Sequence, residues 1–247
     1  DFSLKKYYNI NQLKFLAGES KVNLENVKLN QNFETIDLKR IDVKTFIDQV
    51  KNNDFLVNKS DQILIEGEVF DSKPFLQSIH AKQDRKTFDK NFTSDIKVDF
   101  KKILTGTTDE ISNFAMIASI RKGSYDKLSA KGNFSNEEII EISIYQIDND
   151  TRTLQLISDR AKPFIKNFDF IKGFEGGKLE YQSTIKKEAS NSNLIITDFK
   201  VSKVPALAQL LTLASLQGIA DTLNGEGIRF ESIEIKSSTK NNTINVE

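Results

Sequence analysis

Alternation of apolar and polar residues in many segments is the feature that most constrains the fold of this chain. Residues 61–70 read DQILIEGEVF, in which Ile63, Ile65 and Val69 share one face and the glutamates share the other. A period of two is the pattern of a β-strand with one buried face and one face in water. Further strands are predicted over residues 92–104, 138–147, 151–157, 178–185, 193–201 and 227–235.

Short polar segments connect the predicted strands. Residues 148–150 read Asp-Asn-Asp and residues 191–193 read Asn-Ser-Asn. Because Asn and Asp tolerate positive φ angles, these segments predict tight hairpins between antiparallel neighbours. The fold class that we expect is mainly β: a curved antiparallel meander that forms an open groove, with a few short amphipathic helices.

Each of the three prolines follows a predicted strand and precedes an apolar run. Pro74 and Pro163 both stand in a Lys-Pro-Phe sequence, and Pro205 opens a long apolar run that continues to residue 223. Proline is tolerated in the first turn of a helix, so helices are expected to begin near all three. The third helix would be apolar almost all round and would require cover. The residues expected to form a lid, or else a membrane contact, are Leu207, Leu210, Leu211, Ala214, Leu216, Ile219 and Leu223.

Composition excludes several classes of function. Lys+Arg 35 and Asp+Glu 35 cancel, whereas a nucleic-acid-binding protein normally carries a basic excess. There is no Cys and a single histidine, His80, which excludes multi-histidine or cysteine metal sites and leaves little room for a Ser-His-Asp triad. Glycine clusters at 173–177 and 225–227 precede strands, whereas phosphate-binding glycines follow them. We therefore expect a protein that is not an enzyme, has no cofactor and does not bind nucleic acid.

The predicted strands have apolar faces that the few predicted helices cannot cover. Such a sheet must curl on itself or hold an apolar ligand, and a lipid is the simplest such ligand. No cationic cluster is evident, so selectivity for a head group should be poor. The residues expected to line the lipid-binding groove are Ile63, Ile65, Val69, Ile96, Val98, Ile140, Ile142, Ile144 and Leu154.

The run VPALAQLLTLASLQGIADTLNGEGIRFESIEI, from residue 204, resembles the C-terminal region of the AsmA family of alphaproteobacterial type. In that family a Pro-Ala-Leu-Ala helix follows a strand, and a Gly-x-Gly-Ile-x-Phe strand comes after it. The segments GEVFDSKPFLQS, IRKGSYDKLSAKGNFSNEE and FDFIKGFEGGKLEYQSTI precede it in the family's order. The resemblance covers roughly residues 60–247, with Lys, Asn and Ile where the family usually has Arg, Ala and Leu.

The resemblance implies a bridge-like lipid-transfer protein whose long β-groove crosses the periplasm from an inner-membrane anchor. Residues 60–247 would be its AsmA-like C-terminal region, and residues 1–59 an earlier β-rich part of the groove. The expected partners are phospholipid acyl chains, the remainder of the same long chain and an inner- or outer-membrane surface. The chain begins at Asp1 and ends within an alternating pattern, so the anchor is expected outside this segment. The alternative is a non-catalytic periplasmic scaffold or assembly module of outer-membrane biogenesis with a filled β core.

Overall fold

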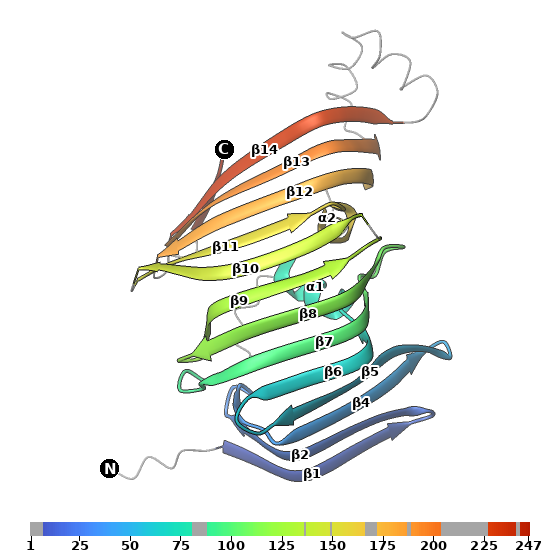
Figure 1. Cartoon of the computed structure of the whole chain (residues 1–247), viewed down its shortest axis with the longest axis vertical. Helices are drawn as coiled ribbons and strands as arrows, with labels where there is room; N and C mark the ends of the chain where they lie inside the picture. The colour runs from blue at the N-terminus through green and yellow to red at the C-terminus, as the bar shows by residue number, and fades with distance from the viewer. Residues whose placement is uncertain are drawn as a thin grey trace.

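The fold is one open, curved sheet of 15 strands (Figure 1). It is seen in a computed structural model that describes residues 7–80, 88–135, 137–148, 150–165, 172–186, 189–203, 227–240 and 243–247. The strands are β1 (Tyr7–Ala17), β2 (Ser20–Asn30), β3 (Thr35–Asp37), β4 (Arg40–Ile47), β5 (Val50–Lys59), β6 (Ile63–Asp71), β7 (Ser94–Leu104), β8 (Glu110–Arg121), β9 (Ser124–Asn133), β10 (Ile139–Asp148), β11 (Thr151–Ser158), β12 (Lys172–Lys186), β13 (Ala189–Lys203), β14 (Ile228–Lys240) and β15 (Thr243–Val246). The mainly β, curved fold predicted from the alternation is confirmed.

Strand order in the sheet follows chain order, except that β3 pairs with β2 and lies off the main path. Every pair on the main path is antiparallel apart from β6 and β7, which are parallel. The predicted antiparallel meander is thus interrupted at this junction. The connection spans residues 72–93 and contains the helix α1 (Lys73–His80), and a parallel pair needs a long crossover of this kind.

Two of the three predicted helix starts are confirmed. Helix α1 begins one residue before Pro74, and α2 (Lys162–Ile165) begins one residue before Pro163. Pro205 and the predicted lid helix, with all seven of its apolar residues, lie outside the described residues. Within the described residues no helix is long and apolar enough to cross a membrane.

The two faces of the sheet differ in chemistry, as β7 demonstrates. Ile96, Val98 and Phe100 are buried, whereas the intervening Asp95, Lys97 and Asp99 are exposed. The strand alternates because successive side chains point to opposite faces. The sheet thus has one apolar face and one charged face, and Figure 1 shows α1 and α2 on the same side of the strands.

A single curved sheet leaves much of the chain in contact with water. The accessible surface is 16572 Å², against about 11,000 Å² for a compact protein of this mass. Residues 1–59 and 60–247 share this sheet, because β5 pairs directly with β6.

One predicted turn is wrong: residues 191–193 do not form a hairpin turn but are part of β13. Its polar residues lie within the strand, where local turn propensity is overridden by pairing with β12 and β14.

Candidate functional site

One row of residues crosses the apolar face from β1 to β14, with one residue from each strand on the main path. The pairing places these residues side by side, and all have apolar or aromatic side chains. This central row consists of Leu13, Leu24, Ile41, Val57, Ile65, Val98, Met116, Ala130, Ile142, Leu156, Tyr181, Leu194 and Ile235. At the usual spacing of strands the row is about 58 Å long. It forms a continuous apolar track across the sheet.

Two further rows flank the central row. The first flanking row contains four of the residues predicted for the groove, and it consists of Ile63, Ile96, Ala118, Leu128, Ile144 and Leu154. The second flanking row contains Ile140, which is paired with Gly132 and Ser158. Ile65, Val98 and Ile142 lie in the central row. Eight of the nine predicted groove residues therefore lie on one face.

Val69 is the one predicted groove residue that does not lie on the apolar face. A register shift between Asp54 and Phe55 places Val69 opposite Asp54, and the next residue, Phe70, packs against Phe55 and Phe100 on the apolar face. Because neighbouring residues of a strand point to opposite faces, Val69 points away from the apolar face. It is buried but belongs to neither cluster of apolar side chains. The simple alternation used for the prediction is broken at this bulge.

The central row is more accessible than the rows beside it. Most of its members are half-buried, including Ile65, Ile142 and Leu156. In the flanking rows, Ile63 and Ile140 are only 2% exposed. The accessible apolar surface is thus narrow and long. Apart from the hydroxyl of Tyr181, the central row is built of hydrocarbon and thioether side chains, and its chemistry suits an extended apolar ligand.

The first flanking row becomes polar where it reaches β12. Leu154 is paired with Ser183, and the row continues through Ser192 and Ser237. The hydroxyl of Tyr181 donates to Ser192 Oγ at 3.1 Å, and Ser192 Oγ donates to Ser183 Oγ at 2.9 Å. These hydroxyls satisfy one another on the apolar side of the sheet. The apolar track is therefore bounded by hydroxyl groups along this side from β12 onward.

On the other side of the central row, β12–β14 carry a stack of aromatic rings. Phe174 and Phe199 lie with ring centroids 5.2 Å apart, and Phe199 and Phe230 lie 5.0 Å apart. The stack belongs to a second apolar cluster, which includes Leu179 and Ile196. The sequence did not predict this stack, although Phe199 and Phe230 stand in predicted strands; Phe174 lies before the strand predicted over residues 178–185. Only the register of three strands brings their rings together.

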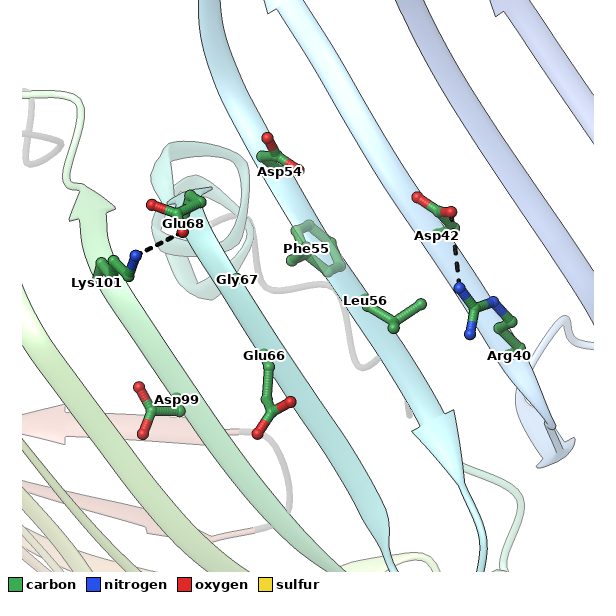
Figure 2. Close-up of a pocket in the computed structure, with 10 residues that line it drawn as sticks. All are labelled: Arg40, Asp42, Asp54, Phe55, Leu56, Glu66, Gly67, Glu68, Asp99 and Lys101. Atoms are coloured by element: carbon green, nitrogen blue, oxygen red, sulfur yellow. Dashed lines mark hydrogen bonds and ion pairs between the residues drawn. The ribbon is translucent and has the colours of Figure 1, made fainter.

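The charged face has a shallow depression of about 440 Å³ (Figure 2). Carboxylates dominate its lining, and Glu68 pairs with Lys101 at 2.7 Å while Arg40 lies 4.0 Å from Asp42. These side chains are well exposed, so their ion pairs are strongly screened by water. Among the described residues no group of His, Cys, Asp or Glu is arranged to hold a metal ion. The depression has the character of a solvated outer surface.

A charged cluster around Arg160 fixes the segment that leads into α2. Its guanidinium lies 2.5 Å from Asp109 Oδ1 and 2.6 Å from Glu138 Oε2. Hydrogen bonds from Arg160 and then Ser135 hold the pKa of the Glu138 carboxyl below its ordinary value. The same pairs raise the pKa of Arg160. The three side chains of this cluster are paired with one another and connect separate elements of the fold, which is a structural role.

Comparison with known proteins identifies no relative. No family profile matches the chain, and neither a curated protein nor a solved structure matches it.

Proposed function

We propose that this chain is a segment of a periplasm-spanning AsmA-like protein that holds phospholipid acyl chains and conducts them between the inner and outer membranes. The observation that carries the proposal is the central row. Its side chains are apolar or aromatic in every strand that it crosses, most of them are half-buried, and the row is long and narrow, as an acyl chain is. The sequence resemblance over residues 60–247 is what supports the family and the periplasmic location in this proposal.

The energetics favour such a ligand. Each CH₂ group that leaves water contributes roughly 0.8 kcal/mol, so a chain that lies along several strands gains a substantial binding free energy. The hydrophobic effect has no preferred direction, so a chain can shift along the row while it keeps similar contacts. The central row offers no charged group to a head group. Binding should therefore depend on acyl chains and discriminate little between head groups.

A filled β core in a non-catalytic scaffold is the second candidate. The near-complete burial of Ile63, Ile140 and Ile196 favours it, because such side chains already have their apolar partners. The two candidates differ in what they predict for the half-exposed central row. A scaffold would leave this row without lipid, and a lipid carrier would have it occupied.

Lipid extraction and native mass spectrometry of the purified chain distinguish the two candidates. The lipid carrier should retain bound phospholipid, and Ile142→Asp should lose most of it because a carboxylate would lie in the central row. Ser143→Asp is the matched control, since it places the same charge on the next residue of β10, which points to the opposite face. Absence of lipid from the parent chain, or equal lipid in a folded Ile142→Asp variant, would contradict the proposal.

A further inference from the structure

The apolar face contains two clusters of buried side chains that meet beneath α2. The larger cluster extends across β2–β10 and includes Ile96, Phe100 and Ile140. The smaller cluster belongs to α2 and β12–β14 and includes Phe199. Only Leu156 and Phe164 pack against both clusters among the described residues. Leu156 lies in the central row, so Phe164 is placed where that row passes from β11 to β12.

Helix α2 is firmly held at this position. The N–H of Ala161 donates to the carbonyl of Gly177 in β12 at 2.8 Å. Pro163 and Ile165 are almost fully buried, and Ala161 is 0% exposed. Arg160, directly before, is tied to Asp109 and Glu138. A one-turn helix with so many attachments is a fixed feature of the apolar face.

Where the central row passes from β11 to β12, it has polar neighbours on one side and a bulky neighbour on the other. On one side the first flanking row changes from Leu154 to the buried Ser183, whose hydroxyl is bonded to Ser192. On the other side stands α2 with the ring of Phe164. An acyl chain that moved sideways would displace the hydroxyl contacts or the ring, and both displacements are unfavourable. Passage between β11 and β12 is thus confined to the central row.

We propose that Phe164 divides the apolar face into two acyl-chain compartments, one over β4–β11 and one over β12–β14, and slows exchange between them. This inference rests on the proposed function, because it assigns an internal barrier to the same lipid-binding face. The barrier is steric, so it depends on the volume of the side chain at position 164. It makes Phe164 a residue that sets the rate of lipid movement without forming a polar contact with the lipid.

Photo-crosslinking tests the barrier directly. The probe is a palmitic acid that carries a diazirine, and it is added to the lipid-depleted chain. Samples are irradiated at increasing times after this addition, and the crosslinked peptides are assigned by mass spectrometry. In the parent chain, crosslinks in the two compartments should accumulate at rates that differ by about tenfold, the effect of a barrier of about 1.4 kcal/mol. In Phe164→Ala the two rates should converge, and in Phe164→Leu they should differ by an intermediate factor.

Two further variants keep the result interpretable. Phe230→Ala removes a ring of the smaller cluster that does not pack against the larger one, so it should leave the difference in rates unchanged. Phe164→Trp should preserve the barrier or increase it, which separates a steric effect from loosening of α2. If the parent chain crosslinks nowhere on the apolar face, the proposed function fails. If both compartments crosslink at the same rate in the parent and in Phe164→Ala, lipid binding stands and the barrier is overturned.

Discussion

Arg160 and Glu138 are joined by two hydrogen bonds, from Nε at 3.0 Å and from Nη2 at 2.6 Å. A third, at 2.5 Å, runs from Arg160 Nη1 to Asp109, whose side chain is 11% exposed. Asp109 lies just before β8, Glu138 just before β10, and Arg160 between β11 and α2. One guanidinium therefore holds together three connections that are distant in sequence, at the point where the two apolar clusters meet.

Replacement of Arg160 by Met should destabilise the fold. The aliphatic part of the side chain is kept, but the poorly exposed carboxylate of Asp109 loses its cation. We expect a loss of about 1–3 kcal/mol in the free energy of unfolding, reduced because Arg160 itself is about a third exposed. Urea unfolding measures it. Arg121→Met is the control, since Arg121 pairs with Asp95 at a more exposed site, where water screens the pair, and should lose much less stability. Equal losses in both variants would contradict the role assigned to Arg160.

Two carboxylates at this junction predict the response to acid. Arg160 chiefly lowers the pKa of Glu138, and the backbone N–H of Ile139 chiefly lowers the pKa of Asp159. Both carboxyls have a lower pKa in the folded chain than in the unfolded chain. At pH values between the folded and unfolded pKa values, the folded chain therefore binds fewer protons than the unfolded chain does. The stabilisation is complete above the unfolded values, near pH 4, and is lost as the pH falls through the folded values. Urea unfolding from pH 6 to pH 2 should show this loss.

The double variant Glu138→Gln, Asp159→Asn removes the two groups that titrate with lowered pKa values at the junction. Its stability should be lower than that of the parent at pH 6 and should fall less steeply below pH 4. Glu66→Gln is a control on the charged face, where the carboxyl is exposed in the shallow depression. An unchanged slope in the double variant would show that other carboxylates govern acid unfolding.

Local signals in the sequence predicted the local structure well. Alternation in residues 138–147 placed Ile140, Ile142 and Ile144 on one face, and the prolines marked the starts of α1 and α2. These features depend on the side chains of one segment and on the conformational limits of proline. They need no knowledge of neighbouring strands. For this reason they could be read without the structure.

Features that depend on pairing could not be predicted in this way. The shift between Asp54 and Phe55 turns Val69 to the other face, and the alternation of residues in this segment does not contain that shift. The parallel pairing of β6 with β7 depends on the path of a long connection. The place where Phe164 meets the central row depends on how α2 docks on β12. Register and crossover are properties of several segments together, and one segment's periodicity does not contain them.

Gly67 should be intolerant of any side chain. It faces Phe55 and Phe100, and an added Cβ would lie 2.5 Å from the carbonyl oxygen of Asp54 and 2.8 Å from the ring of Phe100. Backbone cannot move aside without breaking the β5–β6 pairing, so Gly67→Ala should cost about 1–3 kcal/mol. Thermal unfolding followed by circular dichroism measures the loss. Glu66→Ala, the exposed neighbour in the same strand, should change stability by less than about 0.5 kcal/mol, and a larger loss there than at Gly67 would refute the packing argument.

The edge strand β1 should make the purified chain self-associate. Phe15 and Leu16 are 57% and 65% exposed. As consecutive residues they point to opposite faces of the sheet, so both faces are accessible at this edge. The reason is that β1 has a neighbour only on the β2 side among the described strands. A long apolar edge of this kind offers unpaired N–H and C=O groups to another strand. Within β1 only Lys14 carries a charge that would discourage such pairing.

Leu16→Lys tests whether the edge is responsible. The added charge should raise the dissociation constant of self-association by about tenfold, measured by analytical ultracentrifugation, and leave the melting temperature unchanged. Ile117→Lys is the matched control, because Ile117 is 63% exposed but lies in β8, between two paired neighbours. If association depends on the strand edge, only the first substitution weakens it, since pairing requires free backbone groups next to the side chain. If both substitutions weaken it equally, exposed apolar area in general drives association and the edge of β1 has no special part in it.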